Sequence, residues 1–213
     1  MSDLTQAPNA QSLPRYAFIH RLLHWVIAIL VLLALAFGAT IGYYEFTGLR
    51  DTFGIAITNF IYTTHKTLGI LILGLMVLRL LTRFSFGKPR YATPLPAAQR
   101  VASETVHAAF YVLLLVMAVL GWLATGSGGF PVSLFHIELP AMIGRNDELS
   151  KTLFLWHQYV GYALATLIVL HIVGALYHWR VRRDEVMQRM SLFRGRGARV
   201  TADEPVQRGQ AGS

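Results

Sequence analysis

Four long apolar segments constrain this chain more than any other feature of its sequence. They cover residues 16–42, 58–82, 105–125 and 152–179 of the 213. Each can cross a bilayer as a helix, because about 20 apolar helical residues span a hydrocarbon core of about 30 Å. A helix satisfies its own backbone hydrogen bonds in lipid, and no segment alternates polar and apolar residues as a membrane β-barrel strand does. The sequence therefore predicts an all-α polytopic membrane protein, a bundle of four transmembrane helices.

The composition supports a membrane protein and excludes several kinds of metal site. Hydrophobic residues make up 54% of the chain and charged residues only 14%, whereas soluble domains average about 25% charged residues. The chain has no cysteine, which excludes disulfides, thiolate zinc sites, iron–sulfur clusters and covalent haem attachment through a CxxCH motif. The eight histidines are therefore the obvious remaining ligands for a transition metal.

Basic residues predict the orientation of the bundle. Most of them lie next to segment ends that a four-helix bundle places on one side: Arg15, Arg21, Arg83, Lys88, Arg90, Arg100, Arg180, Arg182, Arg183 and Arg189. The opposite side has few basic residues, and these stand among acidic ones. The positive-inside rule then places both termini in the cytoplasm. This topology accounts for most of the net charge of +8, so we expect no nucleic acid partner.

The chain divides into one domain and two tails. Residues 15–190 contain all four segments, whereas residues 1–14 and 191–213 are polar and are predicted to be disordered tails. Residues 1–14 lack the basic, apolar and cleavage regions of a signal peptide, so the first apolar segment is expected to remain in the protein as a helix. In the longest outer loop, residues 132–142 are a candidate interfacial element.

Ionisable side chains inside a membrane are costly, so each histidine there is a functional candidate. His157 and His171 are 14 residues apart in the fourth segment. At 3.6 residues per turn they share one helix face, about 21 Å apart along the axis. His65 opens the second segment at the level of His157, and His24 lies in the first segment at the level of His171. We call His65 and His157 the outer pair, and His24 and His171 the inner pair.

Two pairs of imidazoles on different helices are the arrangement that two six-coordinate b-type haems require. The sequence therefore predicts two non-covalent haems with bis-histidine ligation. Zinc or non-haem iron is the less favoured interpretation, because the outer pair has no cluster of carboxylates beside it. A haem-free transporter or scaffold that uses the histidines as proton relays is a further hypothesis.

Other polar residues are candidates for binding the haem propionates. Arg79 is 14 residues after His65, which places it on the same face at the level of the inner pair, where a propionate would supply the anion it needs. Lys66 could do the same for the outer haem, or extend to the membrane surface. His107 is a candidate for a hydrogen bond to a propionate or a quinone, or for a simple helix-end role.

The remaining histidines have weaker claims. His20 lies four residues before His24 and is an alternative ligand or an interfacial residue, and His178 is an alternative inner ligand. His136 is expected to be exposed in the outer loop.

Several motifs together resemble the bacterial cytochrome b561 family. The residues that carry the resemblance are His20-Arg-Leu-Leu-His24-Trp25, His65 with Gly69, Val77-Leu-Arg79-Leu-Leu-Thr-Arg83, His107, Trp156-His157-Gln158, Gly161, Tyr162 and His171. The resemblance covers residues 16–190. The broader group also contains the b-type cytochrome subunits of nickel–iron hydrogenases, which generally have an additional helix.

The resemblance implies a four-helix dihaem cytochrome of the bacterial inner membrane that exchanges electrons with the quinone pool. By position, the inner pair matches the family's cytoplasmic haem ligands and the outer pair its periplasmic ones. Some members are superoxide:quinone oxidoreductases, and this activity is the leading hypothesis, although no residue of this chain identifies superoxide by itself. The alternative is a membrane anchor subunit that relays electrons between a partner hydrogenase or dehydrogenase and quinone.

Overall fold

The computed structural model describes residues 15–86, 96–135, 137–184 and 186–193. Three long helices dominate it: α1 (Phe18–Phe86), α2 (Ala97–Ser127) and α3 (Asp147–Tyr177), the last continued by a π-helical turn, η1 (His178–Arg182). A small hairpin of β1 (Val132–Leu134) and β2 (Ile137–Leu139) lies between α2 and α3 along the chain. All three long helices are long and apolar enough to cross a membrane. The expectation of an all-α integral membrane protein is confirmed.

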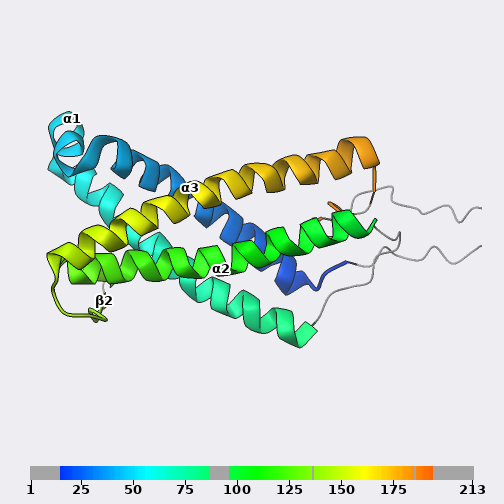
Figure 1. Ribbon diagram of the computed structural model, residues 1–213, viewed down its shortest axis with the longest axis horizontal. Coiled ribbons are helices and arrows are strands. Elements are labelled where there is room, and N and C mark those ends of the chain that lie inside the picture. Colours follow the sequence, from blue (N-terminus) through cyan, green and yellow to red (C-terminus); the bar gives the residue numbers. More distant parts are fainter. Residues whose placement is uncertain (1–14, 87–95, 136, 185, 194–213) are drawn as a thin grey trace, which may run out of the picture.

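The helix α1 consists of two arms that run back along each other. Its backbone leaves the helical conformation at Glu45 (φ 56°, ψ 179°) and Gly54 (φ 82°, ψ 164°), and Figure 1 shows the chain turning back between them. We call residues 18–44 the first arm and residues 55–86 the second arm. The arms contain most of the first two predicted apolar segments, so the single helix α1 accounts for two of them.

Hydrogen bonds between the arms establish their antiparallel register. His20 Nε2 donates to the carbonyl oxygen of Thr82 over 3.0 Å, near the open ends of the arms. His65 Nδ1 donates to the carbonyl oxygen of Ala34, also over 3.0 Å, closer to the turn. The early part of the first arm therefore lies beside the late part of the second arm.

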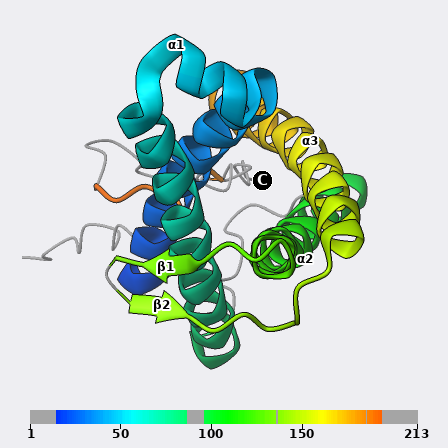
Figure 2. The ribbon, with the colours of Figure 1, turned by 90° about the vertical axis from the view of Figure 1, so that its left-hand side faces the viewer.

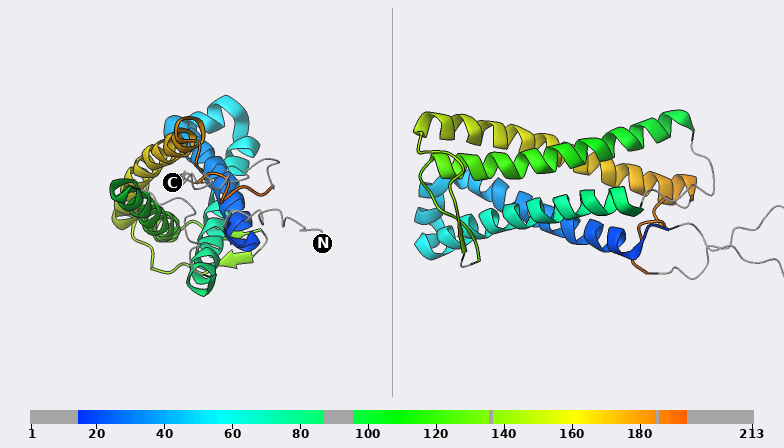
Figure 3. Two further views of the ribbon diagram at one scale, coloured as in Figure 1. Left: turned by 90° about the vertical axis from the view of Figure 1, so that its right-hand side faces the viewer. Right: turned by 90° about the horizontal axis from the view of Figure 1, so that it is seen from below.

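The two arms of α1, with α2 and α3, surround a common apolar core (Figures 2 and 3). Its most buried members are Leu23, Ile27, Val31, Ile72, Met76, Leu114 and Leu164. Leu23 directly precedes His24, and the others lie in the stretch between the level of the inner pair and the level of the outer pair. Many other large apolar side chains are exposed on the outside, including Leu32, Val112 and Val169, as expected of a surface that faces lipid.

The hairpin lies at the end of the bundle where α1 turns back, which we call the outer end (Figure 2). The strands pair antiparallel, with Val132 opposite Leu139. Lys66 Nζ donates to the carbonyl oxygen of Pro131 over 2.8 Å, and Thr67 Oγ1 donates to that of Ser133 over 3.3 Å. The candidate interfacial element at 132–142 therefore contains a hairpin that is tied to the second arm.

At the opposite, inner end, residues 186–193 return to the start of α1. We call this segment the terminal strap. Arg15 donates to the carbonyl oxygens of Ser191 and Phe193, Arg21 to that of Ser191 over 2.8 Å, and Trp25 Nε1 to that of Met190 over 2.9 Å. Ser191 and Phe193, in the predicted C-terminal tail, are thus bonded by Arg15 and by Arg21 of α1.

Some sequence predictions fall outside the described residues. They are the N-terminal tail 1–14, the rest of the C-terminal tail (194–213), most of the loop between α1 and α2 (87–95), and His136.

Candidate functional site: two histidine pairs in the bundle

The structure brings together both histidine pairs that the sequence predicts. The ring centres of His65 and His157 lie 6.0 Å apart with an angle of 85° between the ring planes. Those of His24 and His171 lie 6.2 Å apart with an angle of 71°. The second arm and α3 supply the outer pair, and the first arm and α3 supply the inner pair. Each pair therefore joins α3 to a different arm of α1.

The distances within the pairs fit a metal ion that lies between two imidazoles. Metal–imidazole bonds of about 2 Å, with about 1 Å from each nitrogen to its ring centre, place two ring centres about 6 Å apart on opposite sides of one ion. Within the described residues, no group of three or more histidine, aspartate or glutamate side chains is arranged to hold a metal ion. The donor sets are thus pairs of imidazoles, which suit the two axial positions of a haem iron.

The hydrogen bonds of the outer pair leave one nitrogen of each ring available for a metal. His65 Nδ1 bonds the carbonyl oxygen of Ala34 in the first arm over 3.0 Å, and His157 Nδ1 bonds that of Met117 in α2 over 3.0 Å. A carbonyl oxygen only accepts hydrogen bonds, so each Nδ1 carries the proton and each Nε2 of a neutral ring keeps its lone pair. Histidines that bind metals generally donate their other N–H in this way.

The inner pair has a third histidine beside it. The rings of His107 and His171 lie 5.5 Å apart at 88°, and Phe110 packs on His171 at 5.3 Å. Trp25 packs on His24 at 5.5 Å. The structure thus places His107 beside the inner pair, and the hydrogen bond to a propionate or a quinone that the sequence suggests for it stays a prediction.

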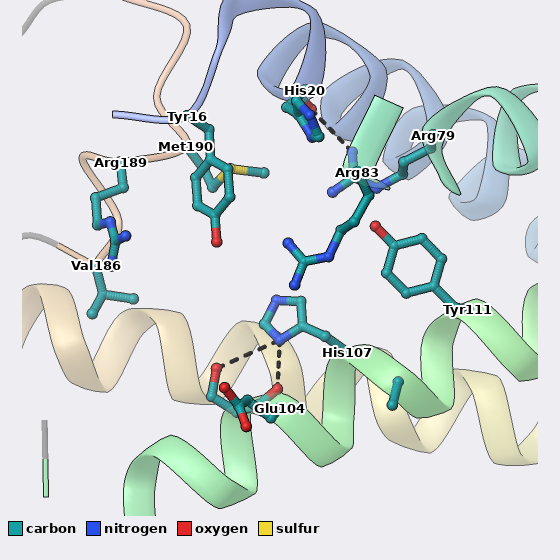
Figure 4. A pocket seen from close by; sticks show the side chains of 12 residues that line it. Tyr16, His20, Arg79, Arg83, Glu104, His107, Tyr111, Val186, Arg189 and Met190 are labelled. Carbon is teal, nitrogen blue, oxygen red and sulfur yellow. Dashed lines mark hydrogen bonds between the residues drawn. The ribbon is translucent and has the colours of Figure 1, made fainter. Parts of the chain in front are cut away.

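A basic pocket opens next to the inner pair, at the inner end of the bundle (Figure 4). Its volume is about 280 Å³, and Arg79, Arg83, His107, Tyr111 and Arg189 are among the residues that line it. Arg79 Nη1 donates to the carbonyl oxygen of His20 over 3.0 Å, which holds its guanidinium at the pocket. Several cationic side chains around one cavity suit an anionic or strongly hydrogen-bonding ligand.

Sequence reasoning does not mark Arg83, Tyr111 or Arg189 of this pocket as candidates for ligand binding. It uses Arg83 for the topology and the family resemblance and Arg189 for the topology alone, and it does not consider Tyr111. Arg83 lies four residues after Arg79, a spacing that places two side chains on one helix face, so the signal was present for it. No spacing in the sequence places Arg189 at the pocket. It reaches the pocket because the terminal strap folds back to the start of α1.

The remaining candidates have partners of their own. His20 is 2% exposed and its Nε2 bonds Thr82, so it joins the two arms. His178 Nδ1 pairs with Asp184 over 2.6 Å at the end of α3. Lys66 holds the hairpin through Pro131. Their roles as haem ligands or propionate partners stay predictions.

A family comparison decides the class of protein. The family model of prokaryotic cytochrome b561 matches residues 15–191, a range that includes both pairs, the basic pocket and most of the terminal strap. The chain belongs to the prokaryotic cytochrome b561 family. It is therefore a membrane electron-transfer protein of the b-type cytochrome class, and the predicted family is confirmed.

Individual cytochrome b561 relatives match across most of this chain. Cytochrome b561 homolog 2 of Escherichia coli is 28% identical over 83% of this chain and 90% of its own length. A protein named probable superoxide oxidase CybB, from Yersinia pestis, is 25% identical over 83% of this chain and 95% of its own length. Cytochrome b562 of Cereibacter sphaeroides is 27% identical over the same shares.

Proposed function

We propose that this cytochrome binds two b-type haems, one at the outer pair and one at the inner pair, in a bundle with four membrane spans. The two arms of α1 would each form a span, together with α2 and α3. The ring distances of 6.0 and 6.2 Å within the pairs are the observation that carries the proposal. Two further observations support it. The outer imidazoles donate their Nδ1–H groups to backbone carbonyl oxygens, as metal-binding histidines generally do, and the cytochrome b561 family binds b-type haem.

The proposed orientation places both termini in the cytoplasm and the outer end in the periplasm of a bacterial inner membrane. At the inner end, Arg83 and the strap residue Arg189 line the pocket and Arg15 and Arg21 bind the strap. At the outer end, Arg50 pairs with Asp51 and Lys151 with Glu148, so the acidic residues offset the basic ones. The positive-inside rule favours the cytoplasm for the more basic end.

Haem at each pair would supply reversible one-electron chemistry. The residues of this chain would hold and insulate it. The imidazoles of the two pairs would bind iron, and the core residues between the levels, such as Leu164 (1% exposed), would exclude water. Because the outer pair is bonded to backbone carbonyls of two helices, its rings would keep their orientation during turnover.

We further propose that quinone exchanges electrons at the basic pocket. Tyr111 and Arg83 line it and can donate hydrogen bonds to the carbonyl oxygens of a quinone head group. Its volume of about 280 Å³ is close to the lower end of small-molecule sites, about 300 Å³. The pocket adjoins His107, which contacts the inner pair, so electron exchange there would be short-range.

Superoxide is the proposed periplasmic donor. The similarity to a protein named probable superoxide oxidase supports this substrate. Two superoxide ions would each give up one electron and leave as dioxygen, and the two electrons with two protons from water would reduce one quinone to quinol. A partner hydrogenase or dehydrogenase is the competing donor, in which case the chain would serve as a membrane anchor subunit.

The purified protein tests these proposals in turn. Haem extraction should yield two haems b per polypeptide, and His157→Ala should retain one. Superoxide should reduce the oxidised protein, and added ubiquinone should reoxidise it. Absence of porphyrin would exclude the cytochrome function, and one haem per chain would exclude the dihaem proposal. Reduction by a co-purifying iron–sulfur protein, with no reaction toward superoxide, would favour the anchor subunit.

A further inference from the structure

Two glycines on different helices face the two rings of the outer pair. A Cβ atom at Gly38, in the first arm, would lie 3.0 Å from His65 Cε1. A Cβ atom at Gly121, in α2, would lie 2.9 Å from His157 Cε1 and 3.2 Å from its Nδ1. These distances leave no room for a methyl group, so each ring rests directly against the backbone of the facing helix.

Each glycine lies four residues after the residue whose carbonyl oxygen accepts the hydrogen bond of the facing histidine ring. His65 bonds Ala34, four residues before Gly38, and His157 bonds Met117, four residues before Gly121. In an α-helix the carbonyl of residue i points at the N–H of residue i+4. A side chain at i+4 therefore stands beside the path by which an imidazole reaches that carbonyl. The same arrangement occurs twice, on unrelated helices.

The inner pair is built differently. Within the part of the chain that the structure describes, no hydrogen bond from the ring nitrogens of His24 or His171 is found, and their neighbours are aromatic or basic: Trp25, Phe110 and His107. Arg79, at the same level, adds a half-buried positive charge at the pocket. The two pairs thus differ in two properties that tune the potential of a haem, the hydrogen bonding of its axial ligands and the polarity of its surroundings.

We propose that Gly38 and Gly121 are positioning residues that seat the outer imidazoles on the carbonyls of Ala34 and Met117, and that this seating makes the outer haem the lower-potential centre. This inference rests on the proposed dihaem function. Donation of Nδ1–H to a carbonyl raises the basicity of Nε2, which stabilises ferric over ferrous iron at the outer pair. The positive charge of Arg79 favours the reduced state at the inner pair. Electron flow from the outer end to the inner end is therefore downhill.

The test is a redox titration of the holoprotein and its alanine variants, monitored by optical spectra and by electron paramagnetic resonance of the low-spin ferric haems. In the wild type, His157→Ala should remove the lower-potential wave and leave the higher one. Gly38→Ala and Gly121→Ala should shift the lower wave to higher potential, or lose the outer haem alone, and leave the inner wave in place. Gly74→Ala is the matched control, because a Cβ at Gly74 meets nothing within 4 Å.

The outcomes separate this inference from the proposed function. Two haems whose potentials are the same in Gly38→Ala, Gly121→Ala and Gly74→Ala would overturn the positioning role and leave the dihaem function standing. Removal of the higher wave by His157→Ala would overturn the order of potentials. Fewer than two haems in the wild type would overturn the proposed function itself. If the alanine variants at 38 and 121 do not accumulate, the wave lost in His157→Ala still decides the order.

Discussion

The terminal strap offers a prediction whose size follows from its hydrogen bonds. Arg21 Nη1 donates to the carbonyl oxygen of Ser191 over 2.8 Å, and the guanidinium stacks near the ring of Phe18 at 5.7 Å. A hydrogen bond from a charged donor contributes about 1.5–3 kcal/mol when it is shielded from water. Because Arg21 is only partly buried, the lower end of that range applies.

The perturbation is Arg21→Met, which retains an apolar stem and removes the charged donor. A loss of about 1.5 kcal/mol should raise the open fraction of the strap roughly tenfold, since 1.4 kcal/mol corresponds to a factor of ten. The amide of Tyr16 reports this opening, because it donates to the carbonyl oxygen of Arg189 in the strap over 3.3 Å.

Hydrogen exchange measured by mass spectrometry on the detergent-solubilised holoprotein is the assay. Exchange of the Tyr16 amide should accelerate about tenfold, while the core of α2 stays unchanged. The same variant should raise the KM for quinone, because Val186, Arg189 and Met190 of the strap line the basic pocket. Lys151→Met, which removes an exposed ion pair at the outer end, is the control. An unchanged exchange rate of the Tyr16 amide in Arg21→Met would refute the role of the Arg21–Ser191 hydrogen bond in holding the terminal strap.

Three further predictions concern the ligands, the core and the hairpin. His171→Ala should remove the inner haem and His178→Ala should not, as measured by haem content; the reverse result would reassign the inner pair. Leu164→Ala should lower the free energy of unfolding by about 2–5 kcal/mol, the usual cost of truncating a buried leucine, seen as a lower midpoint of thermal haem release; an unchanged midpoint would mean that the core does not support the haems. Lys66→Met should make the hairpin more accessible to protease, because the hydrogen bond from Lys66 to Pro131 is exposed and still worth about 0.5–1.5 kcal/mol; cleavage between 132 and 139 at the wild-type rate would contradict this.

Part of the candidate site follows from helix geometry alone. The 14-residue spacing of His157 and His171 predicts two levels on one face of α3, and the structure places His65 and His24 at those levels. Arg79 follows from the same spacing relative to His65 and does lie near the inner pair's end. These residues were predictable because position along a helix depends only on its rise and its repeat.

Other parts of the site could not be predicted in this way. The acceptors of the outer imidazoles are main-chain carbonyls, and every residue type carries one, so nothing in the sequence marks Ala34 or Met117. Nothing in the sequence distinguishes Gly38 and Gly121 from the other glycines among the 18 of the chain. Their importance depends on which ring faces them, and that depends on how each helix is rotated about its axis.

The sequence by itself determined that the chain lies in a membrane as helices and that its histidines stand at two levels, because hydropathy and the helical repeat act within each segment. Only the tertiary structure decided which side chains meet. The contacts from His65 to Ala34 and from His157 to Met117 join residues 31 and 40 positions apart, and the terminal strap meets α1 across some 170. Such contacts arise from the packing of whole helices against one another, where rotation and tilt are settled by all the side chains in the core together.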